Sequence, residues 1–312
     1  MMSKKSQYQK REPSTLQLFF RSFFQHRLGI LGLSIIALMI LSAIFAVQIS
    51  GHDPVKFDPM ASRLSPSWSH IMGTDQLGRD VFSRVLFGAR ASIYVGVISS
   101  LLATIIGTFF GSIAGYLGGK FDTLMMRISE IFMTFPQLIL VLIIGSLLGK
   151  GINNVIFIFA VSGWMTTFRL VRGEFFSLRE EAFVEADRAF GFSKKRIIFR
   201  HLLPNTLSPI VVAFTTNTAI YIIAEAGLSF LGLGVSMTTP TWGNLLAAAR
   251  EPSVVDQYWW LWVFPALSIM IFVFAVNYIG DALRDVLDPR QRTLVAKASR
   301  LLNLFKKKGA QS

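Results

Sequence analysis

Six long apolar runs constrain what this chain can fold into. An apolar stretch of about 18 or more residues with few charges is long enough to cross a bilayer as a helix. The runs cover residues 28–49, 91–117, 128–148, 152–168, 207–233 and 258–279. Only 16% of the residues are charged, against about 25% in soluble domains. The sequence therefore predicts an all-α polytopic membrane protein with six transmembrane helices.

Lysine and arginine predict the orientation of these helices. The chain carries 31 basic residues and a net charge of +13. If the N-terminus lies inside, 24 of the 31 fall in the tails and inner loops. Because inner loops of membrane proteins are enriched in Lys and Arg, both termini are expected in the cytoplasm. The basic excess then reflects the topology of the chain in a lipid bilayer. We therefore expect no nucleic-acid partner.

The runs divide the chain into five parts. We expect a cytoplasmic tail with an amphipathic interfacial helix at 1–27, a first span at 28–49, an outer loop at 50–90, a five-helix core at 91–280 that includes a polar loop at 170–206, and a cytoplasmic tail at 281–312. The second half of the outer loop has helical periodicity. We therefore expect a short separate helix there, resting on the outer face.

Two features within the spans are candidates for packing or function. Gly107, Gly111 and Gly115 recur four residues apart, which predicts a face on which another helix packs closely. Glu225 lies deep in the fifth run, where an unpaired charge is costly. Such a carboxylate either forms a structural bond between helices or lines a polar path or gate. The sequence leaves both readings of Glu225 open.

A charged stretch separates the fourth and fifth runs. It reads EADRAFGFSKKRIIFRHLLPN, residues 185–205. Just before and within it, Phe176, Phe183 and Phe190 recur seven residues apart. With charged residues on the other positions, this spacing predicts one amphipathic helix over 174–190.

A turn and a second helix are expected to follow. Gly191 is placed to cap the first helix, because glycine adopts the left-handed conformation at little cost. Ser193 is placed to cap a second helix, and Pro204 marks the approach to the fifth span. The pattern predicts a cytoplasmic helix–turn–helix elbow suited to docking in a groove of a partner. A surface helix without such a role is the alternative.

The elbow resembles the Glu-Ala-Ala…Gly…Ile-x-Leu-Pro signature of membrane subunits of binding-protein-dependent ABC importers. The matching positions are Glu185, Ala186, Gly191, Leu203 and Pro204. Two positions depart from the signature: Asp187 stands in place of the second Ala, and His201 in place of the Ile. A histidine at the latter position is usual for the peptide-transporting branch.

Three further segments resemble the same branch in the same order. They are residues 73–96, 226–234 and 280–290, and with the first span they extend the resemblance over nearly the whole chain. The chain is therefore similar to the second membrane subunit of dipeptide, oligopeptide and nickel permeases. The resemblance implies the type I ABC importer permease fold in a bacterial inner membrane.

The resemblance also implies roles and partners. The elbow would be the coupling element that meets an ATPase, through Glu185, Ala186, Asp187, Gly191, His201, Leu203 and Pro204. The implied partners are a homologous permease subunit, two ABC ATPase subunits and an extracytoplasmic substrate-binding protein. ATP and Mg²⁺ would be bound by the ATPases, and no cofactor by this chain. The implied substrates are peptides, with glutathione or nickel chelates as alternatives.

Other function classes have less support in the sequence. There is no cysteine, and the phosphate-binding, serine-nucleophile and zinc-binding motifs are missing. An intramembrane enzyme would need a titratable partner for Glu225, and no neighbouring span supplies an obvious one. An ion-coupled carrier or channel remains a different-class alternative. We expect this chain to be a non-catalytic subunit without a metal site.

Overall fold

The computed structural model describes residues 22–287, and every regular element in that range is helical. Five helices are long and apolar enough to span a membrane. They are α2 (Arg27–Ile44), α4 (Val81–Leu117), α7 (Ile152–Leu178), α11 (Leu207–Phe230) and α14 (Trp260–Leu287). The interfacial helix expected at 1–27 lies mostly outside the described residues.

The third expected span, 128–148, is wrong as a straight helix. It is replaced by α5 (Gly119–Thr134) and α6 (Gln137–Leu148), which meet at a bend of 88°. The bend falls at Pro136, because a residue before proline is pushed out of the helical region, and Phe135 is extended at φ −91° and ψ 138°. Hydropathy does not register this break, since the residues on both sides are apolar.

Three other boundaries differ from the expected ones. The first span ends at Ile44, and a short α3 (Ala46–Ser50) follows. The helix expected in the second half of the outer loop is present from Val81, but it is continuous with the second span, because α4 runs unbroken through 90. Asp80 caps α4 by accepting a hydrogen bond from the Ser83 backbone N–H at 2.7 Å. At the other end of the chain, α14 continues past 280 to Leu287.

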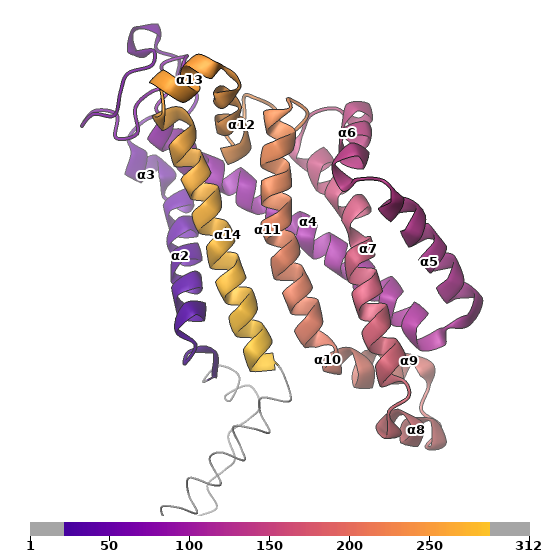
Figure 1. Ribbon diagram of the computed structural model, residues 1–312. Coiled ribbons are helices and arrows are strands. Elements are labelled where there is room, and N and C mark those ends of the chain that lie inside the picture. The colour runs from indigo at the N-terminus through magenta and orange to yellow at the C-terminus, as the bar shows by residue number, and fades with distance from the viewer. Residues whose placement is uncertain (1–21, 288–312) are drawn as a thin grey trace, which may run out of the picture.

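The helices run from end to end of an elongated bundle (Figure 1). The start of α2, the end of α14 and the short α8 lie at one end, and α3, α12 (Trp242–Leu246) and α13 (Pro252–Gln257) lie at the other. The single-turn η1 (Pro59–Ala61) and η3 (Ala247–Arg250) complete the loops between spans. If α5 and α6 count as one broken span, the described chain makes six crossings, so the start of α2 and the end of α14 lie at the same end.

The glycine face on α4 packs against α7, as the sequence predicts. A Cβ atom added at Gly107, Gly111 or Gly115 would lie 2.6–2.7 Å from a backbone carbonyl oxygen of α7. The three oxygens belong to Trp164, Phe168 and Arg172, one turn apart. At such distances no side chain fits, so the glycines let the two backbones approach along three turns. This close contact sets the position of α7, which leads into the elbow.

An ion pair attaches α5 to the same helix. Arg172 on α7 donates to both carboxylate oxygens of Asp122 on α5, with Nη2 to Oδ2 at 2.6 Å. A two-pronged guanidinium–carboxylate contact fixes orientation as well as distance. The first arm of the broken span is therefore attached to α7 near the end that carries the elbow.

Candidate functional site

The elbow is a series of short helices between α7 and α11. After α7 ends at Leu178, the chain turns and α8 (Ala182–Ala189) begins. The expected single helix over 174–190 is therefore wrong, because the turn at 179–181 interrupts it, with the Glu181 N–H bonded to the Leu178 carbonyl at 3.1 Å. The second arm consists of α9 (Lys194–Arg196), the π-helical η2 (Ile197–Leu202) and α10 (Leu203–Asn205).

Gly191 forms the bend between the two arms, as the sequence predicts. Its φ of +75° lies in the left-handed region. Around it, the Phe192 N–H donates to the Asp187 carbonyl and the Gly191 N–H donates to the Arg188 carbonyl, both at 3.0 Å. This pair of bonds is the Schellman pattern that ends a helix on glycine. The predicted cap at Ser193 is also present, since its Oγ accepts from the Arg196 N–H at 3.4 Å.

A side-chain hydrogen bond closes the elbow across this bend. Asp187 on α8 and His201 on η2 meet with Oδ2 and Nδ1 2.5 Å apart. Asp187 is 9% exposed, and the Phe192 ring lies edge-on to His201 with centroids 5.6 Å apart. The two positions that depart from the importer signature therefore contact each other. The sequence alone assigns Asp187 and His201 to the contact with an ATPase. It gives no sign that the two side chains bond to each other.

Apolar side chains fix the elbow to the end of the bundle. Val184 of α8 and Ile197, Ile198 and Leu202 of η2 are buried together with Tyr116, Val171 and Phe175 from α4 and α7. The arms therefore share one core with the two helices joined by the glycine face. A movement of the elbow would be transmitted to α4 and α7, because packed cores deform little.

The outward side of the elbow is unusually apolar. Phe190 is 80% exposed and Phe183 41% exposed. The sequence placed both on the apolar face of one amphipathic helix, and in the structure that face is not covered within the described chain. Glu185, Ala186 and Pro204 are also exposed; Leu203 is half-buried against the elbow's core. Large exposed apolar side chains rimmed by charges are typical of a protein contact. The structure thus separates the predicted coupling residues into an exposed set and the internal Asp187–His201 pair.

Glu225 is buried at the end of α11 that lies opposite the elbow. It is 1% exposed, and its Oε1 accepts hydrogen bonds from Ser229 Oγ at 2.7 Å and Thr241 Oγ1 at 3.1 Å. Thr241 directly precedes α12, and the next residue donates its backbone N–H to Ser92 of α4 at 3.0 Å. Glu225 therefore joins α11 to the segment that crosses over to α4.

A cavity of about 520 Å³ opens beside the bend of the broken span. It lies between the α5–α6 bend, α7 and α11, and its lining is mostly apolar. Gln137, Thr166 and Thr216 are the exposed polar residues of the lining. Ser162 Oγ and Tyr221 Oη, from two further lining residues, are buried and have no hydrogen-bond partner within the described chain. The cavity thus combines a mostly apolar wall with a few polar side chains, as ligand-binding surfaces do.

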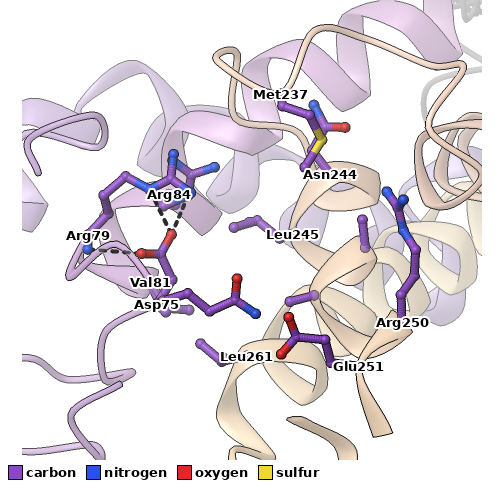
Figure 2. Close-up of a pocket in the computed structure, with 13 residues that line it drawn as sticks. Asp75, Arg79, Val81, Arg84, Met237, Asn244, Leu245, Arg250, Glu251 and Leu261 are labelled. Atoms are coloured by element: carbon purple, nitrogen blue, oxygen red, sulfur yellow. Dashed lines mark hydrogen bonds and ion pairs between the residues drawn. The ribbon is translucent and has the colours of Figure 1, made fainter. Parts of the chain in front are cut away.

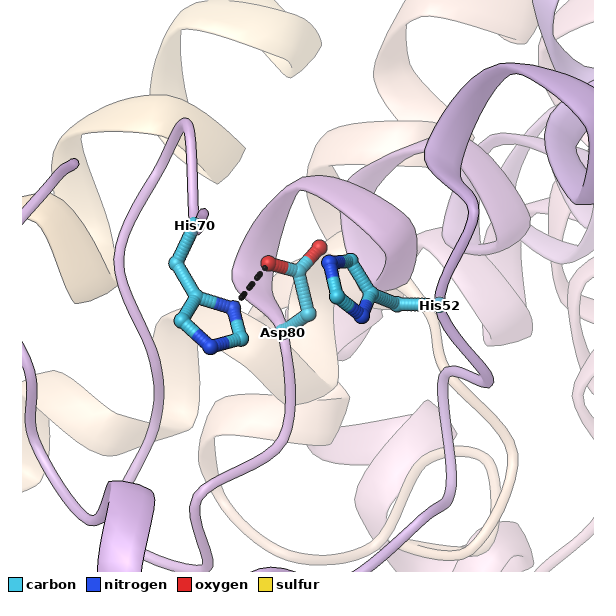
Figure 3. Close-up of side chains that lie close together, drawn as sticks. All are labelled: His52, His70 and Asp80. Carbon is cyan, nitrogen blue, oxygen red and sulfur yellow. Dashed lines mark hydrogen bonds and ion pairs between the residues drawn. The ribbon is translucent and has the colours of Figure 1, made fainter. Parts of the chain in front are cut away.

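The only group of residues in the described chain with the composition of a metal site is at the opposite end from the elbow. His52, His70 and Asp80 bring one ligand atom each within 4.8 Å of one another (Figure 3). Each is already engaged: His70 Nδ1 lies 2.9 Å from Asp80 Oδ1, and His52 Nε2 lies 3.1 Å from the Ser69 carbonyl. Asp80 also caps α4. We therefore assign this cluster to holding the loop against α4.

Apolar spanning helices, one broken span and an elbow of short helices between the fourth and fifth crossings define a polytopic all-α membrane permease. The model of the family described as binding-protein-dependent transport system inner membrane component matches residues 107–293. The N-terminal transmembrane domain of oligopeptide transport permease C matches residues 14–66. The chain belongs to the first of these, the family of binding-protein-dependent transport system inner membrane components.

Individual relatives cover most of the chain. It is 38% identical over 273 residues to the dipeptide transport system permease protein DppC of Bacillus subtilis, which covers 88% of this chain and 85% of the relative. It is 39% identical over 270 residues to the oligopeptide permease OppC of the same species, covering 86% and 88%. It is 42% identical over 273 residues to the glutathione permease GsiD of Escherichia coli, covering 87% and 89%.

A solved structure has the same fold. A chain of the MetNI methionine ABC transporter in an inward-facing conformation aligns with a TM-score of 0.53 at 18% identity. The alignment covers 66% of this chain and 96% of that one. The expected type I ABC importer permease fold is therefore confirmed.

Proposed function

We propose that this chain is one of two homologous membrane subunits of an ATP-driven importer for peptides. It would form the pathway with its homologue, receive substrate from an extracytoplasmic binding protein and be driven by two ATPase subunits that bind ATP and Mg²⁺. The membership of a binding-protein-dependent family and the similarity to dipeptide and oligopeptide permeases support this proposal.

The elbow carries the coupling step of the proposal. Its exposed apolar side chains provide a surface for a groove on an ATPase, and Glu185 and Ala186 flank that surface. Below it, the elbow shares a buried core with α4 and α7. Closure of the ATPases would therefore move two spans together. In the proposed orientation the elbow and both termini are cytoplasmic, which agrees with the distribution of Lys and Arg.

The cavity beside the α5–α6 bend is the candidate pathway surface. A peptide backbone offers N–H donors and carbonyl acceptors at every residue, whereas its side chains vary. A wall of apolar side chains with a few hydroxyl and amide groups suits such a substrate, since it places few demands on side-chain identity. Gln137, Thr166 and Thr216 are the exposed polar residues of the lining that would contact the backbone.

Transport by the reconstituted complex tests this proposal. The permease pair, its ATPases and binding protein are placed in vesicles with a labelled dipeptide. Uptake is expected to require ATP and binding protein and to persist after ionophores abolish ion gradients. Uptake driven by an ion gradient without ATP would instead identify an ion-coupled carrier. ATP-dependent uptake of labelled glutathione or of a nickel chelate, without uptake of the labelled dipeptide, would reassign the substrate.

A further inference from the structure

A second hollow lies at the end of the bundle opposite the elbow. It has a volume of about 280 Å³ and opens between the loop that precedes α4 and the segment from α12 to α13 (Figure 2). Asp75, Arg79 and Arg84 line one side, and Arg250 and Glu251 line the other. The hollow shares no lining residue with the larger cavity beside the α5–α6 bend. It is therefore separate from the candidate pathway.

The carboxylate on the first side of the hollow is fully used. Asp75 Oδ1 accepts the backbone N–H groups of Leu77 and Arg79 at 2.9 and 3.0 Å. Its Oδ2 accepts from Arg79 Nε at 2.7 Å and lies 3.6 Å from Arg84 Nε. One negative charge is thus shared by two guanidinium groups.

Arg84 is the less satisfied of the two. Its side chain is 3% exposed, and its Nη1 donates to the Pro54 carbonyl at 3.0 Å. Within the described residues, its Nε has no hydrogen-bond partner. A buried cation that shares its only counter-ion bears an uncompensated desolvation penalty. A second carboxylate in the hollow would offset that penalty.

The other side of the hollow carries one arginine and one glutamate, and the glutamate is already paired. Glu251 is bound by Arg63, with Nη2 and Oε2 3.0 Å apart. Arg250 donates from Nη2 to the Ser229 carbonyl at 3.3 Å, and in the described chain it pairs with no carboxylate. A guanidinium has five N–H donors, so Arg250 retains several. Two arginines from distant segments therefore border one hollow without a full counter-charge.

We propose that this hollow is a docking site for an acidic side chain on the extracytoplasmic binding protein. This inference rests on the proposed function and on the orientation that places the hollow outside. At about 280 Å³ the hollow has room for an inserted Asp or Glu side chain, and its charged lining suits a carboxylate. Guanidinium groups bind carboxylates with two parallel hydrogen bonds, which would fix the orientation of the docked protein.

Arg250 provides the test, because it is exposed and holds little of the fold together. In vesicles that contain the whole transporter, ATP hydrolysis is titrated with purified binding protein. Arg250→Glu is expected to raise the half-saturating concentration by about tenfold or more, and Arg250→Lys by less, because it keeps the charge. The matched control is Lys56→Glu, the same charge reversal on the outer loop away from the hollow. Added salt should weaken the wild type more than Arg250→Glu.

The possible results separate the inference from the function on which it rests. If Arg250→Glu and Lys56→Glu give the same half-saturating concentration, the docking site is overturned while the importer function stands. A changed KM for peptide with an unchanged requirement for binding protein would assign the hollow to substrate and also overturn it. Loss of the second membrane subunit on purification would assign the hollow to that interface. If binding protein fails to stimulate even the wild type, the proposed function itself fails.

Discussion

At the scale of single residues, the pair Asp187–His201 bears most directly on coupling. Both residues lie in the segment that resembles a coupling motif, yet they bond to each other at 2.5 Å instead of facing outward. Asp187 is almost fully buried, so its carboxylate depends on this contact. We infer that the two residues position the exposed surface of α8 relative to η2.

A double-mutant cycle checks that role. Asp187→Ala and His201→Ile, which introduce the apolar residues of the importer signature, should each weaken ATPase copurification by leaving the other polar group unpaired. An unsatisfied buried group costs about 1–3 kcal/mol. The double variant removes both groups and should therefore lose less than the sum of the single losses. Arg200→Ala, on the exposed side of η2, is the control. Strictly additive losses would mean that the contact does not matter.

The buried carboxylate of Glu225 yields a second prediction at this scale. Glu225→Gln keeps an acceptor for Ser229 and Thr241 and should leave expression and transport near normal. Glu225→Leu removes the acceptor for both hydroxyl protons, and a buried donor left unsatisfied costs about 1–3 kcal/mol, so protein levels should fall. Both variants are compared by membrane content and by peptide uptake. Normal levels of Glu225→Gln without uptake would show instead that the charge lines a path or gate.

At the scale of elements, Gly191 controls how the two arms of the elbow meet. A Cβ at this position would have no atom within 4 Å, so the constraint is the backbone φ of +75° and not space. A left-handed conformation costs most residues about 1–2 kcal/mol, and β-branched ones more. Gly191→Val should therefore misalign the arms and release the ATPases while the spans still insert. Gly191→Asn, which tolerates this conformation, should retain them.

Copurification and coupled hydrolysis decide the outcome. The ATPase subunits are purified through a tag on each variant, and substrate-stimulated ATP hydrolysis is measured in vesicles. A normally inserted Gly191→Val that holds its ATPases and couples hydrolysis to uptake would remove the elbow from the coupling mechanism.

The sequence predicts those elements whose signals are local. The glycine face on α4, the cap at Gly191 and five of the six expected spans follow from spacing within one segment. The bend at Pro136 is missed because hydropathy averages over it, and the unbroken start of α4 because Asp80 caps it ahead of the apolar run. Contacts between distant segments leave no local pattern. For this reason the Asp187–His201 bond and the hollow shared by Arg84 and Arg250 required the three-dimensional arrangement.

At the scale of the whole molecule, the orientation of the bundle decides which end meets the ATPases. The start of α2, the end of α14 and α8 lie at one end (Figure 1), so these helix ends and the elbow share one side of the membrane. The distribution of Lys and Arg favours the cytoplasm for that side. In that orientation the hollow with Arg250 would open on the extracytoplasmic side, where the proposed binding protein would dock.

Reporter fusions test this orientation. A reporter that is active only in the cytoplasm should be active when fused after position 190 in the elbow or after Ser312, and silent near Val55 in the loop before α4. The broken span makes the fusion at 190 informative: if α5 and α6 failed to cross together, the elbow and the N-terminus would lie on opposite sides. Activity near Val55 would invert the molecule, placing the elbow outside, where no ATPase could reach it.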